Sequence, residues 1–236
     1  MSEPVLELED VSKDYHGLRP LRIARLSLAP GEQVSLVGFD QSTAEIFVNL
    51  VTGASLPDRG SIRLFGRHTA DIKDSDDWLT TVDRFGIVSR RSVLLEAMTV
   101  VQNLAMPFTL DIEPPAPDVR ERAAAIAREV GLAQEVLDRS IVELDALSVF
   151  AVRLGRALAL NPSVLLFEHP TAEVAPPDIR ALAARCRAVA ERRNIAAVVL
   201  TADREFAADA ASRVLTLDPA TGRLSGGGWF SRFRRA

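Results

Sequence analysis

The stretch VSLVGFDQSTAEIFVNLVTG, residues 34–53, carries the pattern that decides the fold. Its first four residues are mostly apolar and predict a buried strand. Gly38 ends that strand, a short polar segment follows, and apolar residues then recur at helical spacing, at Ile46, Phe47, Leu50 and Val51. A strand, a glycine-led loop and a helix in this order are typical of an α/β domain.

The same stretch has the outline of a phosphate-binding loop, G-x-x-x-x-G-K-[ST], whose backbone and lysine hold phosphates and whose hydroxyl holds Mg²⁺. Counted from Gly38, the second glycine falls on Thr43, the lysine on Ala44 and the hydroxyl on Glu45. A positive charge is lost, a negative one is gained, and Asp40 adds another. Like charges about 4 Å apart repel by roughly 4 kcal/mol at an effective dielectric near 20. We therefore expect tight nucleotide binding by the standard mechanism to be lost.

The loop residues themselves point the same way. Gln41 and Thr43, on either side of Ser42, stand where glycine would let the backbone take positive φ and wrap an anion. The only lysines of the chain, Lys13 and Lys73, do not follow a strand into a helix, so neither replaces the missing one. From this segment alone, an ordinary strand–loop–helix unit explains the pattern equally well.

Composition narrows the class of protein. The 236 residues are 47% hydrophobic and 25% charged, with a mean hydropathy of +0.10, which is typical of a soluble globular protein. No apolar stretch approaches the roughly 20 residues of a transmembrane helix. The acidic N-terminus, MSEPVLELED, lacks an apolar signal region and predicts the cytoplasm, and the net charge of −4 argues against nucleic-acid binding.

The N-terminal third predicts short strands separated by turns. Val5, Leu6 and Leu8 alternate with acidic residues, which is typical of a half-buried strand. Further strands are expected at residues 21–28, 61–65 and 86–88, with a polar helix at 72–84.

The middle of the chain, from about residue 90 to residue 160, is predicted as a helical lobe inserted into an α/β core. It contains a proline-rich connection at residues 107–117. Asp118 to Glu121 is expected to start a helix with a carboxylate variant of the capping box, and Gly131 is expected to end that helix.

The core resumes at residues 163–170, a predicted buried strand that ends in a carboxylate. A helix entering at Asp178 follows, and residues 196–200 and 213–217 are further buried strands, so the sheet is predicted to be largely parallel. Cys186, the only cysteine, is expected to be a small core residue rather than a nucleophile. The apolar face of the helix comprises Ile179, Leu182, Ala183, Cys186, Val189 and Ala190.

Four motifs stand in a telling order: VSKDY (11–15), TVVQNLAMP (99–107), GRALALNP (155–162) and LLFEHP (165–170). With them, from about residue 5 to residue 225, the chain resembles the ATP-binding cassette of ABC transporters, especially cassettes of lipoprotein or lipid trafficking. The resemblance implies a P-loop NTPase-like α/β fold with a mostly parallel core sheet, N-terminal antiparallel strands and an inserted helical lobe. The cassette would span residues 1–225, followed by a flexible tail at 226–236.

The resemblance also assigns roles to single positions. Tyr15 matches the aromatic residue that stacks on adenine, and the glutamine that senses Mg²⁺ and faces the transmembrane partner falls on Arg90. Both glycines of the LSGGQ signature are lost, and Leu147 would obstruct the approach to a partner's nucleotide. The aligned signature positions are Leu144, Asp145, Ala146, Leu147 and Ser148.

The motif LLFEHP aligns with the metal-site strand and catalytic glutamate of the family, LLLDEP. Glu168 keeps a carboxylate and is the only retained candidate metal ligand, whereas His169 replaces the catalytic glutamate. The switch histidine falls on Ala202. A histidine is able to act as a general base, but it cannot polarise water beside a Mg²⁺ ion that is not held. No catalytic residue is therefore expected to be intact.

Plainer interpretations of these residues stay open. Tyr15 would be a surface aromatic residue near a turn, and His169 a hydrogen-bonded structural histidine. Arg90 and Arg91 would be a solvated pair, or a contact to a partner or an acidic lipid headgroup. Tail residues Trp229 to Arg235 combine aromatic and basic side chains, which favours a membrane-surface or partner contact, or disorder.

The leading prediction is a non-hydrolysing structural or regulatory subunit of a membrane transport complex, cytoplasmic and peripheral to the inner face of the membrane. Its partners would be permease subunits, another cassette, or both, in a homo- or heterodimer, without nucleic acid. No cofactor is expected, and ATP with Mg²⁺ would bind only weakly. One alternative is a divergent ATPase that works in a heterodimer. Another is a scaffold or sensor whose acidic pocket of Asp40, Glu45 and Glu168 attracts a cation or an amine.

Overall fold

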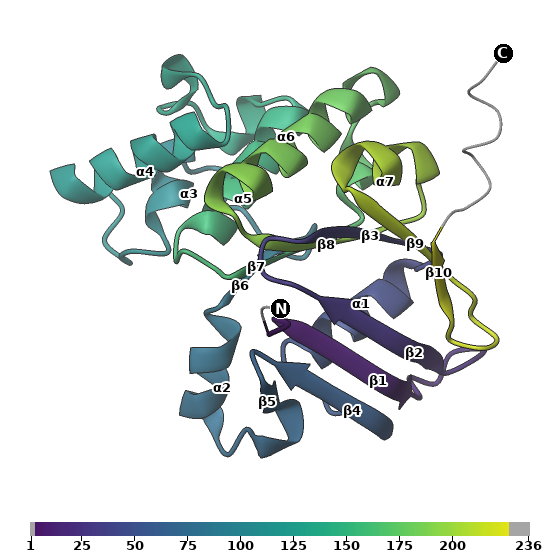
Figure 1. The fold of residues 1–236 in the computed structure, drawn as a ribbon. Helices are drawn as coiled ribbons and strands as arrows, with labels where there is room; N and C mark the ends of the chain where they lie inside the picture. Colours follow the sequence, from purple (N-terminus) through teal and green to yellow (C-terminus); the bar gives the residue numbers. More distant parts are fainter. Residues whose placement is uncertain (1–2, 227–236) are drawn as a thin grey trace, which may run out of the picture.

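The computed structural model describes residues 3–226, which form two β-sheets with helices packed on them (Figure 1). The larger sheet has the strand order β10-β9-β3-β8-β7-β6, and all of its pairings are parallel except that of β10 with β9. Its strands are β3 (Gln33–Val37), β6 (Phe85–Val88), β7 (Val164–Glu168), β8 (Ala196–Thr201), β9 (Arg213–Leu217) and β10 (Leu224–Gly226). The predicted, largely parallel sheet is confirmed.

The smaller sheet is antiparallel, with the order β2-β1-β4-β5. Leu6 pairs with Leu28 and Leu8 with Leu26, so one face of alternating apolar residues is buried, as the sequence predicts. The strands are β1 (Leu6–Lys13), β2 (Leu21–Leu28), β4 (Arg59–Leu64) and β5 (Arg67–His68).

Helix α1 (Gln41–Val51) lies between the two sheets (Figure 1). Its buried residues Phe47 and Leu50 share one hydrophobic cluster with Leu8 of β1 and Leu36 of β3. Burial of such side chains stabilises the fold by about 1.5–3 kcal/mol each, so this helix fixes the antiparallel sheet against the core sheet.

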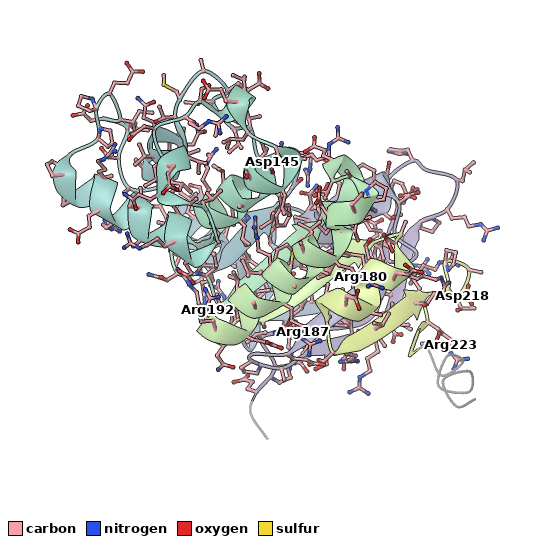
Figure 2. The ribbon with its side chains drawn as sticks, turned by 90° about the horizontal axis from the view of Figure 1, so that it is seen from above. Asp145, Arg180, Arg187, Arg192, Asp218 and Arg223 are labelled. Atoms are coloured by element: carbon pink, nitrogen blue, oxygen red, sulfur yellow. The ribbon has the colours of Figure 1, made fainter. Side chains whose placement is uncertain are left out.

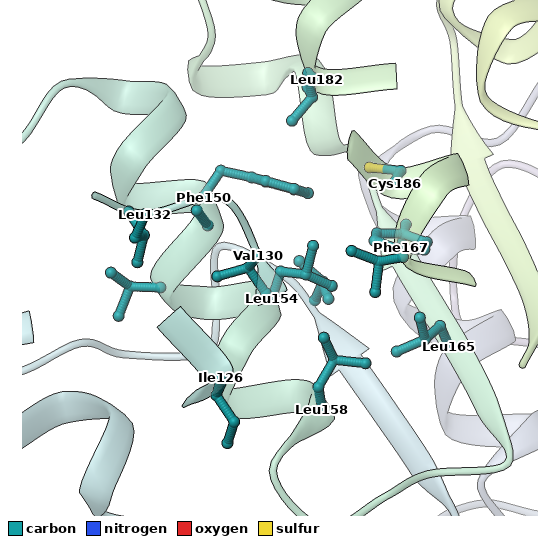
Figure 3. Close-up of a cluster of buried hydrophobic side chains, with 14 of the residues drawn as sticks. Ile126, Val130, Leu132, Phe150, Leu154, Leu158, Leu165, Phe167, Leu182 and Cys186 are labelled. Atoms are coloured by element: carbon teal, nitrogen blue, oxygen red, sulfur yellow. The ribbon is translucent and has the colours of Figure 1, made fainter. Parts of the chain in front are cut away.

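The other face of the core sheet carries most of the remaining helices. Phe150 stacks on Phe167 with ring centroids 6.4 Å apart, and Leu182 and Cys186 complete the same cluster (Figure 3). Cys186 is buried, and burial raises the pKa of its thiol, which confirms it as a core residue. These helices are α3 (Val100–Ala105), α4 (Pro117–Glu129), α5 (Ala146–Leu158), α6 (Ile179–Arg193) and α7 (Arg204–Ala210).

Two helix boundaries differ from expectation. Helix α4 begins at Pro117 after Ala116, which makes no side-chain cap, so the capping box expected at Asp118 is wrong. Proline at the first helical position lacks the N–H that a cap would satisfy. Gly131 follows that helix at φ +77°, and it ends the helix as predicted. Helix α2 (Ser75–Val82) is shorter than the expected 72–84, because Asp74 caps it by accepting from the N–H of Asp77.

Short 3₁₀ turns join the larger elements: η1 (Thr69–Asp71), η2 (Gln134–Val136), η3 (Ile141–Glu143), η4 (Pro170–Glu173) and η5 (Pro176–Asp178). Among the helices of residues 3–226, none combines the length and apolarity needed to cross a membrane. The tail residues from Trp229 to Arg235 lie outside the described residues.

The parallel sheet brings distant motifs to one edge. The chain leaves β3 at Gly38, β6 at Ser89, β7 at His169 and β8 at Ala202. Because these four strands are parallel, their carboxyl ends open onto the same side of the sheet, where α/β proteins place their ligands.

Candidate functional site

The segment that aligns with a phosphate-binding loop is mostly helix. Helix α1 begins at Gln41, so Gln41 to Glu45 of the aligned segment are helical. Only Gly38, Phe39 and Asp40 connect β3 to the helix. Without glycine at 41–43 to hold an open loop, the helix extends back to the first residue able to cap it.

Asp40 is that cap. Its Oδ1 accepts from the backbone N–H of Thr43 at 2.8 Å, and the backbone N–H of Asp40 donates to Thr43 Oγ1 at 2.9 Å. The N–H of Thr43, aided by its hydroxyl, holds the pKa of the Asp40 carboxyl below its usual range. A helix N-terminus attracts anions. Here the anion is the protein's own carboxylate.

Phe39 packs the short loop against the hydrophobic core. Its side chain is 1% exposed and meets Phe47 edge to face, with centroids 5.6 Å apart. Gly38 has φ +99°, and a Cβ at this position would lie 3.2 Å from the carbonyl oxygen of Leu217. The turn therefore needs glycine at Gly38 and buries an aromatic ring in the next position.

The charges at the centre of the site belong to Glu45, Glu168 and Arg91. Arg91 Nη2 lies 2.7 Å from Glu168 Oε2, and its Nη1 lies 3.1 Å from Glu45 Oε1. The other oxygen of Glu168 accepts from Gln41 Nε2 at 2.5 Å. One guanidinium therefore joins the two carboxylates that align with the metal-binding positions of the cassette.

Burial indicates which of these ion pairs contributes more to stability. The side chain of Glu168 is 1% exposed, whereas those of Arg91 and Glu45 are 41% and 43% exposed. A buried carboxylate needs a counter-charge and hydrogen bonds, and Glu168 obtains both from Arg91 and Gln41. Its hydrogen bond to Glu168, followed by the nearby charges of Glu168 and Glu45, raises the pKa of Arg91. The pair Arg91–Glu45 is more exposed and contributes less.

This arrangement bears on two interpretations from sequence. Arg90 and Arg91 are both exposed, and each also forms an ion pair within the chain, Arg90 with Glu173 and Arg91 with Glu168. The three carboxylates do not form an open acidic pocket, because Asp40 caps its own helix and Arg91 forms ion pairs with the other two. Within residues 3–226, no group of three or more His, Cys, Asp or Glu side chains is placed to hold a metal. The Glu168 carboxylate, which aligns with the metal position of the resemblance, is paired with Arg91.

Arg90 turns away from this centre. Its Nε lies 2.9 Å from Glu173 Oε1, and Arg153 Nη1 of α5 lies 2.5 Å from the other oxygen of Glu173. Arg153, Glu173 and Arg90 line a cavity of about 20 Å³ together with His169. A cavity of this size holds about one water molecule.

His169 follows β7 in a left-handed conformation, with φ 45° and ψ 55°. Its backbone N–H donates to the carbonyl of Leu200 at 2.9 Å, which fixes it against β8. Its Nε2 is buried, and within the described residues it has no hydrogen-bond partner. His169 is therefore hydrogen-bonded through its backbone, whereas its side-chain Nε2 makes no hydrogen bond to the described residues.

Tyr15 is half-buried at the edge of the antiparallel sheet. Its ring covers Gly17, where a Cβ would come within 2.5 Å of the ring. Burial, and then the charge of Asp40, raises the pKa of its hydroxyl. The Tyr15 side chain thus packs against the antiparallel sheet, near Asp40 at the N-terminus of α1.

The signature positions form a helix start. Asp145 caps α5 by accepting from the N–H of Ser148 at 2.8 Å, and it stands at the N-terminal end of that helix (Figure 2). This N–H lowers the pKa of the Asp145 carboxyl. Leu147, with Leu144, packs partly against the core of its own chain. Ala146 is the first helical residue, and the glycine-rich turn of the resemblance is replaced by a capped helix.

Ala202 stands alone at the end of β8. It is exposed, and the next residue, Asp203, caps α7 by accepting from the N–H of Phe206 at 3.0 Å. A methyl side chain offers neither donor nor acceptor at this edge.

Arg91 is the functional residue that the sequence prediction missed. Its pairing depends on three elements that converge only in space: the end of β6, the end of β7 and the first turns of α1. A signal was nonetheless present. A carboxylate predicted at the end of a buried strand needs a cation, and the two adjacent arginines after β6 were the available ones.

Replacing Arg91 with alanine should lower the free energy of unfolding by about 1–3 kcal/mol. A fully buried pair that loses one partner costs about 3–5 kcal/mol, and the 41% exposure of Arg91 reduces that figure. Urea denaturation measures the change. Adding Glu168→Gln should recover most of the loss, because an amide needs no counter-charge.

The matched control is Arg139→Ala, which removes a half-exposed i,i+4 pair with Glu143 at 3.2 Å. It should cost less than about 1 kcal/mol. An Arg91→Ala loss no larger than that of Arg139→Ala would show that the Arg91–Glu168 pair does not support the site.

Asp40→Asn should reduce the acid sensitivity of the fold. The native pKa of Asp40 lies below its unfolded value, so its contribution is fully present above that value, near 3.9, and is lost as pH falls through the native pKa. Asparagine still caps a helix but does not titrate in this range. Urea denaturation at pH 6 and pH 3 should show a larger loss for the wild type than for the variant.

Asp111→Asn serves as the comparison, because Asp111 is exposed and its carboxylate accepts no hydrogen bond within residues 3–226. Equal acid sensitivity of the wild type and both variants would contradict a titrating cap at Asp40.

Comparison with known proteins gives the family. No protein-family model matches the chain. The lipoprotein-releasing system ATP-binding protein LolD of Maricaulis maris is 32% identical over 211 residues, covering 88% of this chain and 91% of LolD. The methionine import ATP-binding protein MetN of Brucella abortus is 27% identical over 217 residues, covering 92% of this chain. The chain spans only 58% of the length of MetN.

Solved structures agree on the fold. CbiO1 of Clostridium perfringens, part of the ABC transporter complex CbiONQ, has a TM-score of 0.79 at 17% identity, over 95% of this chain and 88% of CbiO1. A dimeric ATP-binding cassette bound to ADP and phosphate has a TM-score of 0.75 at 22% identity, over 94% of this chain and 98% of that cassette. The expected cassette fold and the resemblance to lipoprotein-trafficking cassettes are confirmed. The chain belongs to the family of ABC transporter ATP-binding proteins.

Proposed function

We propose that this chain is a non-hydrolysing structural or regulatory subunit of an ABC-type membrane transport complex. The observation that carries the proposal is that the protein's own charged side chains pair with one another or with the helix N-terminus in this site. Asp40 occupies the N-terminus of α1 as an anion, and Arg91 joins Glu45 and Glu168 as a cation. A carboxylate already lies at the helix N-terminus, where a phosphate would bind, and a guanidinium already lies at Glu168, where a metal ion would bind.

Electrostatics opposes replacement of these side chains by a ligand. Phosphates approaching α1 would meet the carboxylates of Asp40 and Glu45, and a metal ion approaching Glu168 would meet the guanidinium of Arg91. Displacing Arg91 also requires breaking its 2.7 Å pair with a buried carboxylate. We infer that millimolar Mg-ATP does not compete with these intramolecular contacts.

The signature segment supports the same proposal for the second half of a composite site. In ABC dimers, by the family resemblance, one subunit's signature completes its partner's nucleotide site. Here the equivalent residues begin α5 with Asp145 as cap, and Ala146 and Leu147 replace the glycines. A negative cap at this position disfavours a partner's phosphate. The alternative of a divergent ATPase that relies on a heterodimer therefore has little support.

The relatives suggest where such a subunit acts. LolD is named for a lipoprotein-releasing system, MetN for methionine import, and CbiO1 as part of the transporter complex CbiONQ. We extend this setting to the present chain. It docks on permease subunits, pairs with another cassette or with a second copy, and stays at the inner face of the membrane. Its transported substrate is not specified by the site.

Calorimetric titration of the purified chain with Mg-ATP should give no binding heat up to about 1 mM, because both charge positions are filled. The same measurement on Arg91→Ala shows whether opening the cation position alone restores binding, and none is expected while Asp40 and Glu45 remain. Micromolar affinity in the wild type would contradict the proposal.

The reconstituted complex provides the second readout. ATP turnover by the complex should be the same with wild-type chain as with Glu168→Gln, since Glu168 serves no reaction. A turnover that falls when Glu168 is changed, with the complex still assembled, would assign hydrolysis to this chain.

A further inference from the structure

The segment between β6 and α3 connects the core to the inserted helices. We call residues 89–99 the connector. The connector contains both Arg90 and Arg91, and the two side chains leave it in different directions. One pairs with groups of the core, and the other reaches a group shared with helix α5.

The core side is held by Arg91. Its guanidinium joins Glu168 at the end of β7 to Glu45 in the second turn of α1, at 2.7 and 3.1 Å. Its backbone N–H also donates to Ser89 Oγ at 3.1 Å. Since Glu168 is almost fully buried, the start of the connector is tied to the centre of the core sheet by a pair that solvent screens poorly.

The helical side is held by Arg90 through Glu173. Arg90 Nε and Arg153 Nη1 pair with the two oxygens of Glu173, at 2.9 and 2.5 Å. Arg153 belongs to α5 and is only 16% exposed. Glu173 lies in η4, just after β7, so this shared carboxylate joins the connector, the core and the helical region at one point.

Further hydrogen bonds fasten the rest of the connector to the helices. Arg156 of α5 donates to the carbonyl of Val93 at 2.6 Å. Asn103 of α3, which is fully buried, accepts from the N–H of Leu95 at 2.9 Å and donates to the carbonyl of Leu95 at 3.0 Å. The connector therefore has ties to rigid elements along most of its length.

We propose that Arg90 and Arg91 form a two-sided clasp that holds helices α3 to α5 and the core sheet in one relative arrangement without any bound ligand. The clasp deepens the proposed function, because the carboxylates it uses are free only if they hold no metal–nucleotide complex. Separating the helices from the core sheet requires breaking the ion pairs of both Arg90 and Arg91, which are adjacent in the chain. A cassette of this kind gives its partners a fixed surface.

The test is a distance measurement by pulsed electron resonance on the full chain. Spin labels at Glu121→Cys in α4 and Asp209→Cys in α7 report the helical region and the core. Both positions are exposed, and within residues 3–226 neither side chain makes an ion pair. The native Cys186 is buried and stays unlabelled.

We expect one narrow distance distribution in the wild type, unchanged by Mg-ATP. Arg91→Ala combined with Glu168→Gln, which leaves no unpaired buried carboxylate, should widen the distribution about twofold, and so should Glu173→Gln. Arg139→Ala, whose ion pair lies within the helical region, should leave the width unchanged.

A narrow distribution in both clasp variants, or a broad one in the wild type, would overturn the clasp. Titrating Mg-ATP into the same labelled sample separates it from the proposed function. Binding of Mg-ATP, together with a narrow distance distribution when nucleotide is absent, would contradict the proposed exclusion of Mg-ATP from the site and leave the clasp standing. If Mg-ATP does not bind and the distance distribution is broad, the clasp is refuted and the proposed function stands.

Discussion

The guanidinium of Arg91 lies against the carboxylate of Glu168, and the rest of the site depends on that contact. Glu168 ends a strand buried on both faces, so its charge must be balanced where it lies. Arg91 supplies the balance, and in doing so it draws the chain after β6 onto α1 and β7. Together with the Asp40 cap, it leaves the phosphate and metal positions of the cassette fold occupied by the protein's own side chains.

The same physics links this site to the architecture around it. Parallel strands open onto one edge, so residues far apart in sequence meet there, and their charges must be compatible. The consecutive arginines meet that requirement on two sides, one at Glu168 and one at Glu173. Residues that align with a catalytic apparatus thereby become structural ties between the core and the inserted helices. In the function proposed here, these ties, rather than a nucleotide cycle, set the surface offered to a permease or a second cassette.

Most of the fold was predictable because its signals are local. Apolar runs such as Ala196–Thr201 and the alternation at Leu6 and Leu8 define strands wherever they occur. The start of α1 was not predicted, because it depends on a competition that Asp40 and Thr43 decide by capping each other. The sequence shows that the motif residues are replaced, but it does not show which contacts the new residues make. An acidic pocket of three carboxylates was one alternative from the sequence, and the arginine that pairs with two of them comes from a third strand end.

A crystal structure grown in excess Mg-ATP tests the central claim most directly. It should show Asp40 still capping α1 and Arg91 still joining Glu45 to Glu168, with no phosphate at the helix N-terminus. Phosphate density on the N–H groups of α1, with Arg91 displaced and a metal ion beside Glu168, would contradict the claim that the protein's own side chains fill this site.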